Sequence, residues 1–120
     1  MAAIATILVM EPEAILMAIV KTDVPMTAQL CEQTILELVK RYPFLRTELL
    51  TETAFGRKIR TLVMGQGKRR VIYSAAHHAN EWITTPVLLK FAEDLAQAIA
   101  EGGSIFGVPG QMLKEYCTIR

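Results

Sequence analysis

The sequence predicts a layered α/β fold. Three observations predict it: a continuous apolar run at 70–75 that is rich in β-forming residues, a helix pattern directly after it, and an earlier helix followed by two strand-like stretches. A buried strand that leads directly into a helix is typical of layered α/β folds. In such folds the functional side chains gather at the carboxyl ends of the strands.

The first predicted helix spans residues 27–41. Thr27 is a residue type that caps helices, and Pro43 ends the helix because the residue before a proline avoids the α region. Apolar residues recur at helical spacing in this stretch. They are Cys31, Ile35, Leu38, Val39 and Tyr42. Cys31 is expected to be a buried free thiol, since the second cysteine, Cys117, is distant in the sequence.

Two strands are predicted next, at 46–52 and 57–64, with a Phe-Gly turn between them. A second turn is predicted at 65–67, where two glycines flank a glutamine. The run at 70–75 reads Arg-Val-Ile-Tyr-Ser-Ala. Such a continuous apolar run predicts a central strand that is buried on both faces.

The second helix is predicted to begin at Thr84, where Thr-Thr-Pro offers a threonine cap and a proline in the first turn. Its apolar residues form a stripe along one face. They are Leu88, Phe91, Leu95 and Ile99. Gly102 and Gly103 end the helix, and residues 104–120 hold a loop, a short helix and a final strand. We expect an uncovered edge of the sheet to favour self-association.

The composition excludes several classes of protein. With 52% hydrophobic and 21% charged residues, the chain can bury enough apolar surface to fold. Its formal net charge of +1 creates no field that would attract nucleic acid, so no nucleic-acid partner is expected. The basic cluster Lys68, Arg69 and Arg70 is interpreted as a solvated turn, with a binding patch as the alternative.

Residues 1–19 are interpreted as an N-terminal arm without assigned structure, and residues 20–120 as the N-terminal part of a domain. The first 20 residues are apolar, but Glu11, Pro12 and Glu13 interrupt them, so neither half reaches the roughly 18 residues of a membrane span. No basic segment precedes the apolar run, which argues against a secretory signal. The localisation stays open, with the cytoplasm favoured over the cell envelope.

The segment that follows the 70–75 run carries the candidate chemistry. His77 and His78 are the two histidines of the chain, and Glu81 follows His78 at the third position. In a helical turn or tight loop, this spacing brings His78 and Glu81 to the same side. Imidazole nitrogen and carboxylate oxygen both bind zinc at about 2.0–2.2 Å, and catalytic zinc sites commonly take three protein ligands. The pattern also fits a structural role, with Glu81 favoured by a helix N-terminus and the histidines bonded to backbone.

The stretch 71–86 reads VIYSAAHHANEWITTP. It resembles the first zinc-ligand signature of the metallocarboxypeptidases, peptidase family M14, and is most similar to the bacterial branch that includes γ-D-glutamyl-diaminopimelate endopeptidases. Upstream, Tyr-Pro-Phe-Leu at 42–45 and Gly-Arg-Lys-Ile-Arg at 56–60 resemble elements that precede the signature in this family. The chain departs from the family at 51–53, where Thr-Glu-Thr replaces an expected Ile-Gly-x-Ser. The resemblance covers residues 20–120 and implies the zinc carboxypeptidase type of phosphorylase/hydrolase-like fold, which is α/β with three layers, α/β/α, and a mixed sheet. It implies that these residues are a truncated, N-terminal part of the catalytic domain.

By this resemblance, His78 and Glu81 are ligands of Zn²⁺. Asn80 occupies the position at which digestive carboxypeptidases carry a substrate-contacting arginine, so we interpret Asn80 as a substrate-binding residue. Loss of a fixed cation changes what the neighbouring subsite binds, which favours the cell-wall branch. No catalytic residue is assignable, because the family's general-base glutamate and its third zinc ligand, a histidine, are expected beyond Arg120.

The resemblance implies a metallopeptidase that hydrolyses γ-D-glutamyl-diaminopimelate links in peptidoglycan, with a peptide or muropeptide as substrate. Two alternatives stay open. One is a zinc carboxypeptidase acting on ordinary peptide C-termini, which needs an arginine clamp for the substrate carboxylate. The other is a non-catalytic binding module, because a fold does not by itself establish a function. With the third ligand and the base missing, the 120 residues alone are expected to be inactive.

Overall fold

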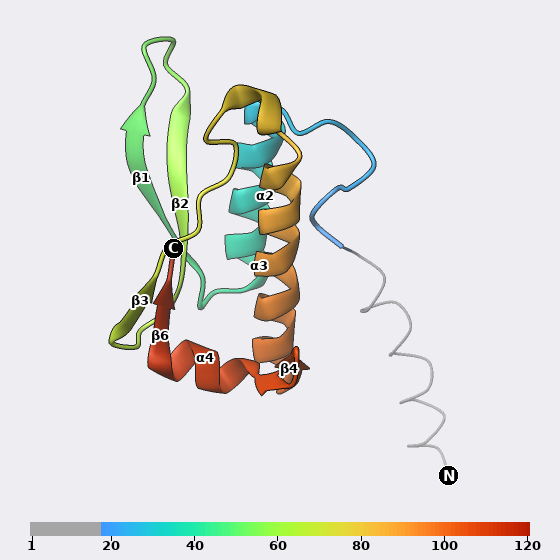
Figure 1. The fold of residues 1–120 in the computed structure, drawn as a ribbon, viewed down its shortest axis with the longest axis vertical. Helices are drawn as coiled ribbons and strands as arrows, with labels where there is room; N and C mark the ends of the chain where they lie inside the picture. Colours follow the sequence, from blue (N-terminus) through green and yellow to red (C-terminus); the bar gives the residue numbers. More distant parts are fainter. Residues whose placement is uncertain (1–17) are drawn as a thin grey trace.

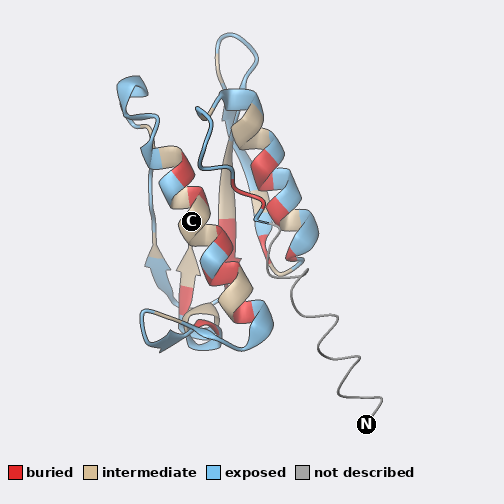
Figure 2. Ribbon diagram, turned by 90° about the vertical axis from the view of Figure 1, so that its right-hand side faces the viewer, coloured by how far each residue is buried: buried red, intermediate tan, exposed pale blue. Residues whose placement is uncertain are grey.

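The computed structural model describes residues 18–120, and Figure 1 shows two long helices side by side against a sheet. In Figure 2 both helices lie in front of the strands, so they cover the same face of the sheet. The sheet has four strands in the order β1-β2-β6-β3 and contains both antiparallel and parallel pairs. The predicted α/β fold with a mixed sheet is confirmed, while the second helical layer of the α/β/α arrangement stays a prediction. Of the predicted arm at 1–19, residues 1–17 lie outside the described residues.

Helix α2 spans Ala28–Arg41, which confirms the helix predicted there. Thr27 caps it as expected, because its hydroxyl oxygen accepts a hydrogen bond from the Leu30 backbone N–H at 3.1 Å. Cys31 lies on this helix as a free, half-buried thiol. Burial raises the pKa of the Cys31 thiol, and the neighbouring Glu32 carboxylate raises that pKa further.

Strands β1, Arg46–Glu52, and β2, Lys58–Gly65, pair antiparallel and confirm the predicted hairpin. A bulge between Leu49 and Thr51 shifts the register within this pair. The turn contains Gly56 at a φ of +75°, a left-handed conformation that glycine adopts without steric cost. The local sequence therefore specifies the hairpin through its turn.

The short strand β6, Cys117–Ile119, lies between β2 and β3 in the sheet. It pairs antiparallel with β2 and parallel with β3, Arg69–Val71. Two glycines allow this approach. A Cβ atom at Gly67 would lie 1.9 Å from the Tyr116 carbonyl carbon, and one at Gly65 would lie 2.2 Å from the Cys117 carbonyl oxygen. The Gly-Gln-Gly segment, predicted as a turn, is thus also the place where backbone packs on backbone.

The prediction of a central strand at 70–75, buried on both faces, is wrong. β3 covers 69–71 and lies at the edge of the sheet, and the Ile72 side chain that follows is 76% exposed. The Tyr73 N–H donates to the Arg120 carbonyl and the Arg120 N–H donates to the Val71 carbonyl, so both bonds face β6. An apolar run indicates a strand but does not reveal which strands flank it, and here one flank is uncovered in the described part of the chain.

Helix α3 spans Thr84–Glu101 and ends at Gly102, which has a φ of +68° as a glycine C-cap requires. Of its predicted apolar stripe, Leu95 and Ile99 are buried, whereas Leu88 and Phe91 are half-buried. Its buried residues pack with those of α2 in one hydrophobic core, and Figure 2 shows them recurring along both helices. None of the helices between residues 18 and 120 is long and apolar enough to cross a membrane.

After α3 the chain forms a small hairpin and a short helix. The hairpin pairs β4, Ser104–Ile105, with β5, Val108–Pro109. Helix α4, Gly110–Tyr116, then leads directly into β6. The predicted short helix and final strand of this region are confirmed, and the final strand belongs to the interior of the sheet.

Glu93 is a buried carboxylate in the middle of α3, with 2% of its surface exposed. Its Oε1 accepts from the Ile19 backbone N–H at 2.5 Å, and its Oε2 accepts from the Val20 backbone N–H at 3.2 Å. The Lys90 Nζ lies 3.8 Å from Oε2. Ile19 and Val20 are themselves buried in the core. Glu93 therefore attaches the beginning of the described chain to α3 through backbone donors that would otherwise be buried without partners.

We expect Glu93→Gln to lower the free energy of unfolding by about 1–3 kcal/mol, because an amide can accept at one oxygen and leaves a buried donor unsatisfied. Urea unfolding followed by circular dichroism measures this change. Asp94→Asn is the matched control, since Asp94 is exposed and its ion pair with Lys90 lies at the surface. Equal stability of the Glu93→Gln and parent proteins would contradict this role for Glu93.

We also expect the chain to self-associate through the outer edge of β3, since the backbone groups of Ile72 make no hydrogen bond within the described residues and exposed edges template pairing. Ile72→Lys should shift the protein toward monomer in light scattering, because a charge at an edge opposes pairing. Phe55→Lys, at the hairpin tip and 93% exposed, adds the same charge away from this edge and should not. An equal effect of both substitutions would show that association does not use β3.

Candidate metal centre

The candidate site lies on the loop that connects β3 to α3. This loop ends in a short 3-10 helix, η1, at Ala79–Glu81, directly before the first turn of α3. His78 precedes η1 in an extended conformation, with φ −105° and ψ 133°. The Glu81 N–H donates to the His78 carbonyl at 2.9 Å and closes the turn. The predicted zinc ligands therefore follow the carboxyl end of a strand, as expected for functional residues of an α/β fold.

The turn brings His78 and Glu81 together. The His78 Nδ1 lies 3.3 Å from the Glu81 Oε1, and both side chains are open to solvent, with exposed fractions of 71% and 49%. At this distance the two side chains form a hydrogen bond across the turn. Two ligands about 2.1 Å from a tetrahedral zinc ion lie about 3.4 Å apart. The two donor atoms thus have a separation that suits one shared zinc ion.

The other predicted residues surround this pair without joining it. The His77 ring packs edge-on against the His78 ring, with 5.3 Å between the centroids. Asn80 lies in η1 with its side chain exposed, and its substrate contact stays a prediction. Trp82 directly follows Glu81 and is 42% exposed. Within residues 18–120 no three His, Cys, Asp or Glu side chains come together as a metal site, so the roles of His78 and Glu81 as ligands and the third ligand stay predictions.

Thr84 does not cap α3 as predicted. The helix begins after Ile83 and has no side-chain cap. The Thr84 hydroxyl instead accepts from the Ala76 backbone N–H at 2.7 Å and donates to the Glu81 carbonyl at 2.8 Å. The threonine cap is predicted from residue type alone, whereas both hydrogen bonds of this hydroxyl go to the preceding loop.

Ala76 has a φ of +50°, a left-handed conformation that a side chain with a Cβ rarely adopts. Strained backbone of this kind persists where the surrounding structure holds it, and it concentrates at functional sites. Here the restraint is the hydrogen bond from the Ala76 N–H to Thr84. The sequence gives no sign of this strain, because alanine is not a residue that marks a left-handed position.

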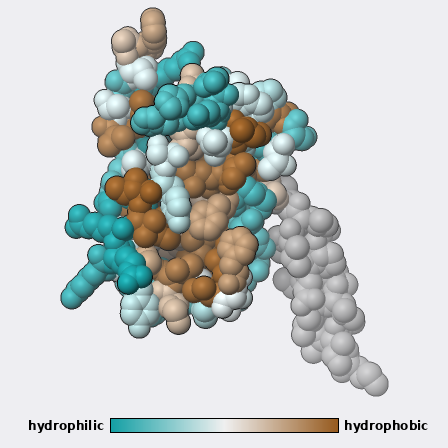
Figure 3. Space-filling view, in the orientation of Figure 1, coloured by the Kyte–Doolittle hydropathy of each residue, from teal (hydrophilic) through white to brown (hydrophobic). Residues whose placement is uncertain are grey.

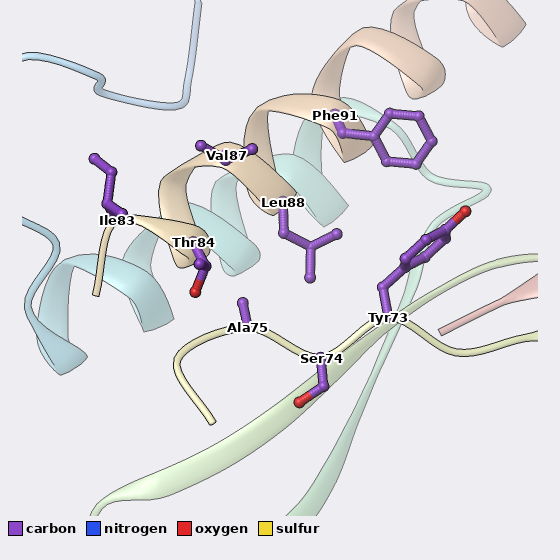
Figure 4. A pocket seen from close by; sticks show the side chains of 8 residues that line it. All are labelled: Tyr73, Ser74, Ala75, Ile83, Thr84, Val87, Leu88 and Phe91. Carbon is purple, nitrogen blue, oxygen red and sulfur yellow. The ribbon is translucent and has the colours of Figure 1, made fainter. Parts of the chain in front are cut away.

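An open, mainly apolar groove of about 360 Å³ adjoins the loop. Figure 4 shows the segment at 73–75 on one side and the first turns of α3 on the other. Leu88 and Phe91 point toward the segment, and the Tyr73 and Phe91 rings meet edge-on at 5.8 Å. In Figure 3 hydrophobic surface extends across the middle of the corresponding face. The sequence did not predict this groove, because it follows from the edge position of β3.

The zinc carboxypeptidase family model, Peptidase_M14, matches residues 31–105, a range that includes His78 and Glu81. The chain belongs to the zinc carboxypeptidase family. Zinc is therefore the metal expected at this pair. The β1–β2 hairpin and the loop lie inside the matched range, and α2 lies inside it from Cys31 onward, so the family resemblance predicted from the sequence is confirmed for the N-terminal portion.

Two curated relatives extend this finding. The chain is 35% identical over 72 residues to gamma-D-glutamyl-L-diamino acid endopeptidase 1 of Lysinibacillus sphaericus, a match that covers 60% of this chain and 18% of that protein. It is 32% identical over 78 residues to the uncharacterized protein YqgT of Bacillus subtilis strain 168, covering 63% and 21% respectively. The chain spans about a fifth of the length of these two relatives. No solved structure matches the chain significantly.

Proposed function

We propose that this chain supplies the first two zinc ligands of a metallopeptidase that hydrolyses γ-D-glutamyl-diaminopimelate links in cell-wall peptides. The observation that carries the proposal is the pair His78 and Glu81, whose donor atoms lie 3.3 Å apart inside the family-matched range. The substrate class is supported by the name of the Lysinibacillus sphaericus relative. The full catalytic domain is proposed to have the three-layer α/β/α arrangement.

The residues of the loop have distinct parts in this proposal. His78 would hold the metal through its imidazole, and Glu81 would hold it through its carboxylate. A zinc ion held there would supply an activated water and a Lewis acid for the scissile carbonyl. Asn80, one position before Glu81 and open to solvent, presents an uncharged amide to the substrate. The third ligand and the general base are expected beyond Arg120.

The 120 residues alone are proposed to be inactive. General acid–base assistance contributes about 10²- to 10⁴-fold to such reactions, and the group that would supply it is not assigned in this chain. Glu81 is occupied as a ligand in the proposal, and Glu93 is occupied with the backbone of Ile19 and Val20. Two ligands also orient a metal less well than three.

We expect weak zinc binding by the isolated chain. Calorimetric titration with Zn²⁺ should show a binding event that His78→Ala abolishes, because it removes one donor, and that Glu81→Gln weakens, because an uncharged amide oxygen replaces the carboxylate. His77→Ala is the matched control, since this neighbouring imidazole contacts His78 through its ring and is assigned no metal bond. Loss of binding in His77→Ala with binding retained in His78→Ala would show that the ligand assignment is wrong.

A chimera tests the catalytic proposal. The matched 72 residues of the Lysinibacillus sphaericus relative are replaced by the aligned residues of this chain, and hydrolysis of a γ-D-glutamyl-diaminopimelate peptide is followed by mass spectrometry. We expect zinc-dependent hydrolysis that is lost in His78→Ala and reduced in Asn80→Arg, because a fixed cation alters the subsite. The 120-residue chain serves as the inactive control.

Three results would contradict the proposal. A folded chimera that binds zinc but leaves the peptide intact would argue against this function for the loop. Turnover by the 120-residue chain, lost in Glu81→Gln, would show that these residues are a complete enzyme and that the assignment of missing parts is wrong. Cleavage of ordinary C-terminal residues instead of the γ-D-glutamyl link would favour the carboxypeptidase alternative.

A further inference from the structure

The Thr84 hydroxyl connects the two ends of the loop that carries the metal pair. It accepts from the Ala76 N–H at 2.7 Å, before the histidines, and donates to the Glu81 carbonyl at 2.8 Å, after them. Figure 4 shows Thr84 on the first turn of α3, facing the segment that contains Ala75. A single side chain on a helix thus fixes both entry to and exit from the loop.

These bonds continue to the candidate ligands through the backbone. Thr84 holds the Glu81 carbonyl, and the N–H of Glu81 donates to the His78 carbonyl at 2.9 Å. That closed turn places the Glu81 carboxylate 3.3 Å from the His78 imidazole. At the other end, the bond to Thr84 restrains Ala76 in its left-handed conformation, at a φ of +50°.

The two bonds require a group that donates and accepts at once. A hydroxyl does both, whereas an alkyl group of the same shape does neither. We infer that Thr84 is a positioning residue for the metal pair, whose hydroxyl holds the loop in the form that directs His78 and Glu81 at one ion. This inference rests on the proposed function, because the metal comes from that proposal. The arrangement of His78 and Glu81 can itself be measured without metal.

Neighbouring positions give matched comparisons. Thr84→Val removes the hydroxyl and keeps the shape, while Thr84→Ser keeps the hydroxyl and removes the methyl. Thr85→Val also removes a hydroxyl and keeps the shape, at the next position of the same helix. The Thr85 hydroxyl makes no hydrogen bond within the described residues. A merely structural loss would lower the melting temperature without acting selectively on the metal pair.

The experiment uses the full 120-residue chain labelled for NMR. Without metal, it records nuclear Overhauser contacts between the His78 ring and the Glu81 side chain, and hydrogen exchange of the Ala76 amide. With Zn²⁺ alone, it records the dissociation constant from the loop resonances. We expect Thr84→Val to remove the contacts, accelerate Ala76 exchange and weaken zinc binding about 10- to 100-fold, as outer-sphere substitutions do. Thr84→Ser and Thr85→Val should behave as the parent protein.

The outcomes separate the inference from the proposed function. If the parent protein binds no zinc but Thr84→Val still removes the His78–Glu81 contacts, the positioning role holds and the metal function fails. If Thr84→Val keeps contacts, exchange and zinc affinity at parent values, the inference is overturned. The inference is also overturned if Thr84→Ser loses the His78–Glu81 contacts, the slow Ala76 exchange and the zinc affinity as fully as Thr84→Val does. If the Thr84→Val protein does not fold, Thr84→Ala is used to repeat the test.

Discussion

Close packing of backbone on backbone at Gly65 and Gly67 is the constraint on which the rest of the fold depends. β6 can lie between β2 and β3 because these two positions lack a Cβ that would overlap its chain. This insertion separates β3 from the hairpin and places it at the edge of the sheet. The loop after β3 consequently runs beside the first turns of α3, where the groove and the candidate metal pair are found.

Local features of the structure could be predicted from the sequence because their causes are local. Thr27, a hairpin turn with Gly56, and Gly102 mark the ends of elements through their own backbone chemistry. The edge position of β3 could not be predicted, because it depends on pairing with a strand about 50 positions later, as the bond between Thr118 and Gly67 illustrates with its separation of 51 residues. The role of Glu93 could not be predicted for the same reason, since its backbone partner Ile19 is 74 residues away in the sequence.

The candidate site could likewise be predicted from the sequence only in part. Sequence spacing was sufficient to place His78 and Glu81 on one side of a turn, since the three-residue interval acts through the backbone of that turn. The role of Thr84 was missed because residue type alone suggested a helix cap, while the hydroxyl serves a loop whose path only the fold defines. Membership of the zinc carboxypeptidase family then makes zinc the expected metal, which spacing and distance leave unspecified.

Trp82 has a practical consequence for work on this loop. It is the one tryptophan of the chain, it directly follows Glu81, and it is partly open to solvent. Indole emission depends strongly on its surroundings, so light emitted by the unlabelled protein originates beside the candidate metal pair. The molecule therefore carries a built-in optical reporter, and optical spectroscopy can follow ligand binding or loop rearrangement there without any added dye.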